Sequence, residues 1–261
     1  MTSDSGKKFR IFIITQEEPF FLSSSIDYFC ARLPDCVEIC GAYVLTQSPF
    51  GRRMGFAARA WSTLRIFGIP FFVFYSANFL LSKLFKPSVA AVLRRFSGKV
   101  STGPININSQ KAIDEISAYR PDVIVSLASN QIFKKELLAV PELCCLNVHT
   151  ARLPEYRGLM PVFWAMASGE KKLGVSVFEM DEGVDTGPIV RQVLLDIHDR
   201  SMHEMIRLSK YVGAEILAES INDLISGKTD RLNNDDSAAT RVRFPTREDV
   251  KRFKKSGRKL F

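Results

Sequence analysis

The sequence predicts an α/β fold in which an open, mostly parallel sheet carries helices on both faces, with a short helical extension at the C-terminus. Three observations support this prediction. The chain has 261 residues, 46% of them hydrophobic, which is enough for one large core. Short β-rich apolar runs alternate with stretches of helical periodicity. This alternation is typical of a parallel sheet, because a parallel crossover needs a helix between its strands.

The N-terminal part reads as a βαβ unit. A β-rich apolar run covers residues 7–15, an apolar-periodic helix is expected from Leu22 to Leu33, and a second strand from Val37 to Leu45. Such a unit places its two strands in one sheet.

The middle of the chain repeats the pattern. An Asn and a Ser can cap a helix over residues 108–119, and a strand follows from Val123 to Ala128. A short helix near Lys134–Val140 then precedes the strand Cys144–Val148. The predicted class is therefore a Rossmann-like sheet with ligands at the carboxyl ends of its strands.

Two more strands and two helices are expected towards the C-terminus. Pro161 opens a short helix, and strands follow over Leu173–Met180 and Ile189–Ile197. A long helix then begins with a capping box, in which Ser201 precedes Glu204 by three residues, and Gly227 ends it.

The net charge of +8 is unevenly placed. Residues 39–113 contain no acidic residue, although the whole chain has 36 basic and 28 acidic ones. This excess indicates an anionic partner, which can be a membrane surface, a phosphorylated substrate or nucleic acid. The basic residues of the acid-free segment are Arg52, Arg53, Arg59, Arg65, Lys83, Lys86, Arg94, Arg95, Lys99 and Lys111.

Residues 66–82 form an uncharged, apolar stretch within that segment. The stretch is shorter than the roughly 20 residues that span a bilayer, and Gly68 and Pro70 interrupt it. Two interpretations stay open. One is a buried helix after Pro70, and the other is an interfacial element through which residues 52–99 contact an anionic membrane.

The five cysteines favour a reducing compartment. Their number is odd and they show no C-x-x-C spacing, so neither a disulfide framework nor a zinc site is indicated, and we expect buried thiols. The N-terminus has no signal-peptide pattern. The predicted location is cytoplasmic, with peripheral contact to the inner face of a membrane as an extension of the second interpretation above.

Asn147 and His149 are the first candidate site residues. They end a predicted strand and are two positions apart, so their side chains point to the same face of the sheet. The loop 181–188, which follows another strand, contains three acidic residues. An Asn amide can donate to an oxyanion, a His can shuttle a proton, and an Asp can orient the imidazole and accept a proton.

The sequence shows no enzymatic nucleophile for this site. No serine lies in a G-x-S-x-G elbow and no cysteine has a signature context. The pattern therefore favours direct attack by an amine substrate over a covalent acyl-enzyme.

The run from Pro121 to Gln192 resembles the formyltransferases that use 10-formyltetrahydrofolate, a family that includes methionyl-tRNA, glycinamide ribonucleotide and sugar N-formyltransferases. Four motifs carry the resemblance over some seventy residues. They are Asn147-Val148-His149, the Leu153–Gly158 loop (Leu-Pro-x-Tyr-Arg-Gly), Gly174-Val175 and Asp185-Thr186-Gly187. One departure is Ala151, where many members have Ser.

The resemblance implies a site. The amine of the acceptor attacks the formyl carbon, Asn147 and His149 stabilise the oxyanion, and Asp185 assists proton transfer and holds His149. The co-substrate is 10-formyltetrahydrofolate and no metal is expected. The folate pocket is expected from Ser129, Asn130, Gln131, Ile132 and Phe133 on one side and from Asp181, Glu182, Gly183 and Val184 on the other.

The resemblance also implies two parts: a formyltransferase catalytic domain over residues 1–227, and a short tail with a basic helix over residues 228–261. The expected acceptor is a small-molecule or phosphorylated amino sugar on a nucleotide or lipid-phosphate carrier. The first loop has no glycine-rich phosphate cradle, which disfavours glycinamide ribonucleotide.

Other functions stay open. A tRNA acceptor ranks lower, because 34 residues after Gly227 are too few for a tRNA-binding barrel. A formyltetrahydrofolate hydrolase and a non-catalytic folate-binding or partner-binding protein are further alternatives. A homo-oligomer is compatible with the sequence.

Overall fold

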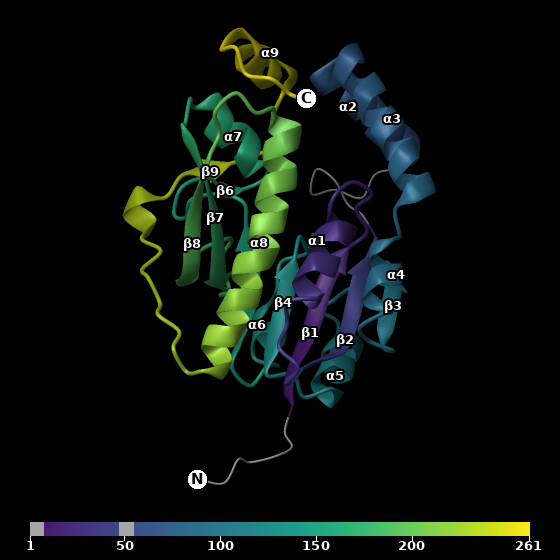
Figure 1. Cartoon of the computed structure of the whole chain (residues 1–261), viewed down its shortest axis with the longest axis vertical. Coiled ribbons are helices and arrows are strands. Elements are labelled where there is room, and N and C mark those ends of the chain that lie inside the picture. The colour runs from purple at the N-terminus through teal and green to yellow at the C-terminus, as the bar shows by residue number, and fades with distance from the viewer. Residues whose placement is uncertain (1–7, 47–54) are drawn as a thin grey trace.

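The computed structural model describes residues 8–46 and 55–261. Within them, seven strands form one sheet in the order β3-β2-β1-β4-β5-β7-β8 (Figure 1). A separate two-stranded sheet pairs β6 with β9. The strands are β1 (Phe9–Gln16), β2 (Val37–Leu45), β3 (Val100–Gly103), β4 (Val123–Leu127), β5 (Cys144–His149), β6 (Arg157–Gly158), β7 (Lys172–Glu179), β8 (Ile189–Asp196) and β9 (Arg241–Val242).

Strand direction confirms a mostly parallel sheet. The pairs β1–β2, β1–β4, β2–β3 and β4–β5 are parallel. The last two pairs, β5–β7 and β7–β8, are antiparallel. One strand, β7, is therefore inverted next to β5.

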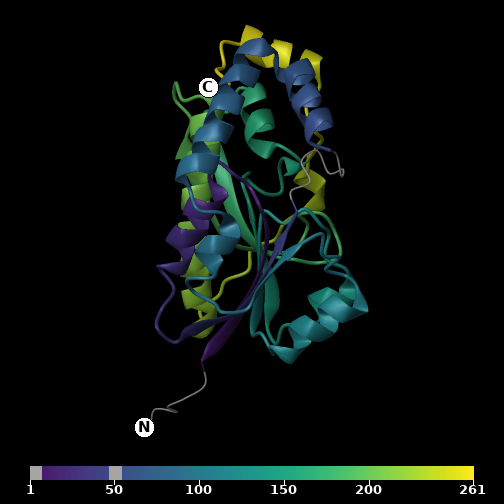
Figure 2. The same ribbon diagram turned by 90° about the vertical axis from the view of Figure 1, so that its right-hand side faces the viewer.

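Helices cover both faces of the sheet (Figure 2). Buried residues of α1, α4 and α8 pack on one face, and those of α5 and α6 on the other. The helices are α1 (Leu22–Cys30), α2 (Phe56–Phe67), α3 (Ile69–Phe85), α4 (Val89–Leu93), α5 (Gln110–Ala118), α6 (Lys135–Leu138), α7 (Pro161–Ala167), α8 (Met202–Ile225) and α9 (Arg247–Lys255).

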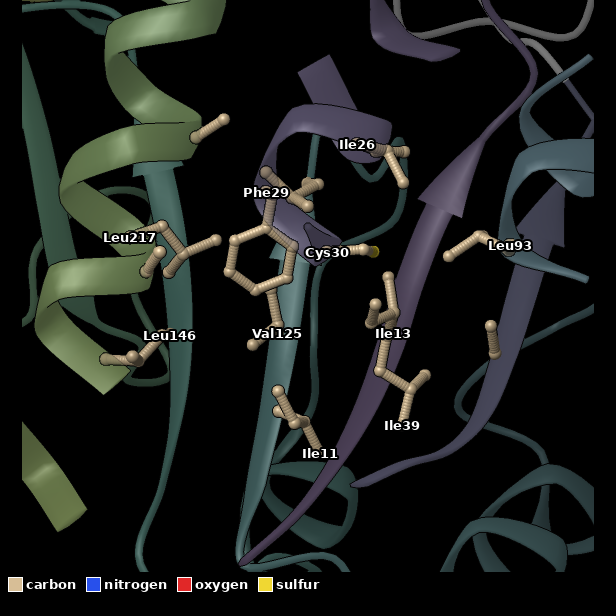
Figure 3. Packing of buried hydrophobic residues seen from close by; sticks show 14 of the residues in the cluster. Ile11, Ile13, Ile26, Phe29, Cys30, Ile39, Leu93, Val125, Leu146 and Leu217 are labelled. Atoms are coloured by element: carbon tan, nitrogen blue, oxygen red, sulfur yellow. The ribbon is translucent and has the colours of Figure 1, made fainter. Parts of the chain in front are cut away.

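The larger core lies between α1, α8 and the sheet. Figure 3 shows Phe29 of α1 between Leu217 of α8 and Val125 of β4, with Ile13 of β1 beside it. Phe29, Leu217, Val125 and Ile13 are all completely buried. Because β1 and β4 are covered on both faces, they are apolar along nearly their whole length, as the sequence pattern indicated.

Several local predictions are confirmed. The observed β2 has the predicted bounds, Val37–Leu45. The capping box of α8 is present, since the Ser201 hydroxyl accepts from the backbone N–H of Glu204 and the Glu204 carboxylate accepts from that of Ser201. The basic C-terminal helix is also present as α9, with its own capping box from Thr246 and Asp249.

One of the two interpretations of residues 66–82 is wrong, and so is the prediction that all the cysteines are buried. In α3, only Phe71 and Ser82 are buried, so this apolar helix is not a core helix. Among the cysteines, Cys36 is exposed and Cys144 is half-buried, whereas the other three are buried. Burial at these positions depends on which distant segments pack against them, and residue composition does not show that. In the part of the chain that the structure describes, no helix is long and apolar enough to cross a membrane.

Residues after 227 pack against the preceding part of the chain. β9 pairs with β6 through Arg157↔Arg241 and Gly158↔Val242. The ring of Phe253 in α9 stacks on Phe163 in α7, with 4.9 Å between the centroids. The division into two parts at residue 227 stays a prediction, but the segment beyond it contacts the loop that the motif Leu153–Gly158 forms.

The glycine of the Gly174-Val175 motif has a packing role. A Cβ built on Gly174 would lie 2.3 Å from the backbone N and Cα of Arg152. The loop that follows His149 therefore rests directly on β7, and only glycine allows this approach.

We expect Gly174→Ala to lower the free energy of unfolding by about 1–3 kcal/mol, because the methyl group forces the two backbones apart. Urea denaturation measures this. The matched control is Gly98→Ala, since a Cβ at Gly98 meets nothing within 4 Å. Equal stabilities of the two variants would contradict the packing role.

Candidate active site

Asn147 and His149 lie on the same face of β5, as predicted. In the sheet, Asn147 pairs with Ser126 on one side and with Phe178 on the other, and His149 pairs with Ser176. The alternate residues of β5 point to the α8 face, where Val148 contacts Gly213. The candidate site is therefore on the face of the sheet opposite α8.

One nitrogen of the His149 ring is held by the backbone. Nε2 lies 2.9 Å from the carbonyl oxygen of Tyr156, and the side chain is buried. Because a carbonyl oxygen only accepts hydrogen bonds, we assign the ring hydrogen to Nε2. In the neutral ring, Nδ1 is then the unprotonated nitrogen.

Asp185 faces the other nitrogen of that ring. Its Oδ2 is 3.7 Å from Nδ1 of His149, too long for a hydrogen bond, and 2.9 Å from the backbone nitrogen of Gly158, from which it accepts. The carboxylate is thus fixed by the 153–158 loop, and the loop carbonyl of Tyr156, not Asp185, orients the ring.

Asp185 reaches His149 by a route that differs from the expected one. Since β7 is antiparallel to β5, Glu179 at the end of β7 pairs with Leu146, near the start of β5. The 181–188 loop must therefore fold back along the sheet to bring Asp185 to the end of β5. Asp185 has φ of 56°, a left-handed conformation that Asp tolerates better than most residues.

Asn234 is a site residue that sequence reasoning missed. Its Nδ2 donates to the carbonyl oxygens of Asp185 (3.0 Å) and Gly187 (2.8 Å). Its Oδ1 accepts from Nη2 of Arg157 at 2.9 Å. Arg157 also pairs with Asp236 and is only 1% exposed. Asn234 therefore ties the loop of Asp185 to the loop that holds His149.

Arg157 was named only as part of a motif. That motif was its signal in the sequence, whereas its burial, which requires several acceptors, is visible only in the structure. No local pattern could have assigned Asn234, which lies 77 residues further along the chain.

The loop after His149 is also fixed from β7. The hydroxyl of Ser176 donates to the carbonyl of Ala151 (2.7 Å) and accepts from the backbone nitrogen of Leu153 (3.3 Å). Gln192 donates to the same hydroxyl. Ala151, the departure from the family pattern, is completely buried, so its side chain is not in a position to contact a ligand.

Asn147 is the member of the site with an available side chain. It is half-buried, and within residues 8–46 and 55–261 its amide makes no hydrogen bond. A half-buried amide beside a histidine can donate to a ligand oxygen without first breaking a protein contact.

The predicted folate residues divide by burial. Phe133 is 1% exposed and packs in the core with Leu137, so its side chain is not available to a ligand, whereas Ile132 is 61% exposed. Asn130 donates to Gln16 (3.0 Å) and to the carbonyl of Thr46 (2.9 Å), and so joins the ends of β1, β2 and β4.

The other predicted folate residues lie in polar loops. Gln131 donates to the Ile105 carbonyl (2.6 Å), and Ser129 contacts the backbone of Gln131. Residues 181–184 are all exposed, and Asp181 accepts from the Gly183 backbone and from Thr186. Met180 packs against the cluster that contains Phe133, which brings both segments to one side of the sheet.

Two cavities lie beside Tyr156, away from the candidate site. One of about 410 Å³ is lined by residues that include Tyr156, Glu170 and Lys172. The other, of about 270 Å³, includes Trp164 and Val242. None of Asn147, His149 and Asp185 lines either one. In the described part of the chain, no three His, Cys, Asp or Glu side chains are grouped to hold a metal.

Comparison with known protein families shows to which family the chain belongs. The formyl transferase family matches residues 58–219 of this chain, more than half of its length. The chain belongs to the formyl transferase family. The matched span contains Asn147, His149 and Asp185 as well as the four motifs, so the resemblance read from the sequence is confirmed.

Curated relatives of this chain include methionyl-tRNA formyltransferases. A methionyl-tRNA formyltransferase of Clostridioides difficile (strain 630) is 39% identical over 137 residues, which are 49% of this chain and 42% of the relative. The chain spans about half the length of the curated relatives that it matches.

Solved structures share the fold over nearly the whole chain. A sugar N-formyltransferase from Shewanella sp. superposes with a TM-score of 0.60 at 16% identity, covering 94% of this chain and 87% of that one. An N-formyltransferase from Helicobacter canadensis, in complex with folinic acid and dTDP-3-aminofucose, gives 0.52 at 16% identity over 92% and 71%. These likenesses show the fold.

We expect Asn234→Ala to lower the free energy of unfolding by about 1–3 kcal/mol, because the buried Arg157 loses an acceptor and two carbonyls lose a donor. Backbone amide exchange over 153–158 and 181–188 should also become faster, while exchange in β1 stays unchanged. Urea denaturation measures the free energy of unfolding, and hydrogen-exchange mass spectrometry measures the exchange rates.

Asn233→Ala is the matched control, since Asn233 is exposed. If both variants exchange alike over the two loops, Asn234 does not connect them.

Proposed function

We propose that this protein transfers a formyl group from 10-formyltetrahydrofolate to a primary amine, and that the amine belongs to an amino sugar on a nucleotide or lipid-phosphate carrier. The observation that carries this proposal is the convergence of Asn147, His149 and Asp185 on one face of β5. Family membership supports the same reaction class.

The geometry suggests a role for each side chain. The folate supplies the formyl carbon that the amine attacks. The free amide of Asn147 donates to the formyl oxygen as negative charge develops there. Because Nε2 of His149 is bound to the carbonyl of Tyr156, Nδ1 is the ring nitrogen that can contact the substrate. When Nδ1 carries a proton, it donates to the formyl oxygen. Asp185, fixed by the Gly158 amide, accepts the proton from the amine. When the oxyanion collapses, the bond between the formyl carbon and the folate nitrogen breaks, and that nitrogen takes up the proton as tetrahydrofolate leaves.

The loops around the site fit a folate. Residues 181–184 expose backbone groups and two carboxylates, and Asn130 and Gln131 border the ends of the parallel strands. A pterin is recognised mainly by donors and acceptors at its edge, and such loops provide both. The Helicobacter canadensis enzyme, which has this fold, was solved with folinic acid.

An amino-sugar acceptor has two supports. The sugar N-formyltransferase from Shewanella sp. shares the fold over 94% of this chain. The Glu18 carboxylate also accepts from the backbone nitrogens of Phe21 and Leu22 at the start of α1. This helix terminus already holds an anion, which disfavours a ribonucleotide phosphate there.

A tRNA acceptor is the second candidate. The curated relatives are methionyl-tRNA formyltransferases, one of them 39% identical, which favours tRNA more than the sequence pattern indicated. The basic residues of 55–99 and α9 would suit a nucleic acid as well as a phosphorylated sugar. A cytoplasmic location stays a prediction.

We expect Asp185→Asn to lower kcat for formyl transfer by about 10²–10⁴-fold, because proton transfer is lost. His149→Asn should lower it by about 10²–10³-fold, because the Nδ1 donor to the oxyanion is lost. Asn147→Ala should lower it by about 10²–10³-fold through loss of an oxyanion donor. Single-turnover assays with saturating folate measure this. Asp185→Asn keeps a residue type that accepts φ of 56°.

The matched control is His198→Asn, because His198 is exposed at 70% and also has positive φ. Full activity in two of the three site variants would overturn the assignment of the site.

Product analysis tests the acceptor. The protein is incubated with 10-formyltetrahydrofolate and, separately, amino-sugar nucleotides, lipid-linked amino sugars and Met-tRNA, with the His149→Asn variant as blank. We expect a formylated amino sugar. If Met-tRNA is the one formylated product, the acceptor is a tRNA and not an amino sugar. The absence of any formylated product would refute formyl transfer.

A further inference from the structure

Helix α3 has the reverse of the polarity that a surface helix normally shows. Except for Lys83, its side chains exposed to solvent are apolar, and the large ones are 53% to 78% exposed. A soluble helix instead places polar residues outside. The exposed apolar residues of α3 are Ile69, Val73, Leu80, Leu81, Leu84 and Phe85.

Helical spacing puts these residues on one continuous face. At 100° per residue, Ile69, Val73, Leu80 and Leu84 form a single stripe, and Leu81 and Phe85 widen it. Ala77 is also exposed within this stripe. We call these residues the outer face of α3.

The inner face is anchored by aromatic contacts. The ring of Phe74 stacks on Phe261 at 4.6 Å, and Tyr75 contacts Phe20 at 4.6 Å between centroids. Phe71 is buried against Phe67. The helix is thus held to the protein by its inner face, and the exposure of the outer face does not arise from a detached helix.

Basic charge surrounds this apolar face. Residues 55–99 contain no acidic residue, and Arg65, Lys83 and Lys86 are exposed there. Helix α2 presents Phe56 and Trp61, which are 67% and 65% exposed. Helix α9, whose exposed basic residues include Lys251 and Lys255, lies beside α2 and α3 at the same end of the molecule (Figures 1 and 2).

We propose that α2 and α3 form a docking surface for an anionic lipid bilayer, in which the outer face of α3 enters the headgroup region and the basic residues meet lipid phosphates. Charge complementarity selects this occupant, because an apolar face within an acid-free segment, flanked by exposed basic residues, matches the interface of an anionic membrane. At 17 residues, α3 would lie in the interface and not span it. The inference concerns binding and does not depend on formyl transfer.

Flotation with vesicles tests the surface. We expect the full chain to bind phosphatidylcholine vesicles that contain phosphatidylglycerol, and to bind pure phosphatidylcholine vesicles or vesicles in high salt much more weakly. In a Trp164→Phe background, Trp61 fluorescence should shift to the blue on binding, since the chain has two tryptophans.

The combined variant Leu80→Ser/Leu84→Ser should lower vesicle binding by about tenfold or more. The control is Leu143→Ser/Leu232→Ser, at positions that are also more than half exposed but lie outside α2 and α3, and it should bind like wild type. Circular dichroism confirms that both fold.

Three results would overturn the proposal. They are absence of binding to anionic vesicles, equal binding by the two variants, and concentration-dependent self-association in light scattering without vesicles that Leu80→Ser/Leu84→Ser abolishes. The last would assign the face to a second copy of this chain.

Discussion

Burial of the Arg157 guanidinium is the constraint on which the arrangement of the site depends. A buried charge needs acceptors, and Arg157 finds them in Asn234 and Asp236, far along the chain. The side-chain amide of Asn234 in turn donates hydrogen bonds to the loop of Asp185. Strand β6, which contains Arg157, also pairs with β9. The pairing of one side chain thus holds together three segments that would otherwise be independent loops.

The inverted strand β7 determines how the site is built. In a fully parallel sheet, polar loops meet at the carboxyl edge. Here the loop after β7 starts at the other end of β5, and Asp185 must return across the sheet to face His149. The site therefore lies on a face of the sheet, where His149 is buried and its ring is fixed by a backbone carbonyl.

The charges of the protein are divided between two regions. At the carboxyl end of β1, Glu17 and Glu18 accept from the backbone nitrogens at the starts of α4 and α1, so these helix termini are neutralised internally. The exposed basic residues Arg65, Lys83 and Lys86 of the acid-free segment lie instead in or next to α2 and α3, whose other exposed residues are mostly apolar. The two helix termini therefore need no external anion, whereas the basic surface can bind an anionic ligand.

The sequence by itself determined the α/β class, the bounds of β2, the capping box of α8, the basic helix α9 and the shared side of Asn147 and His149. These features follow from the pattern of residues that are close to one another along the chain. Only the tertiary structure decided the direction of β7, the partners of Arg157, the burial of Phe133 and the exposure of α3. These features depend on which distant segments meet, and the energies of such contacts leave no periodic trace in a single sequence.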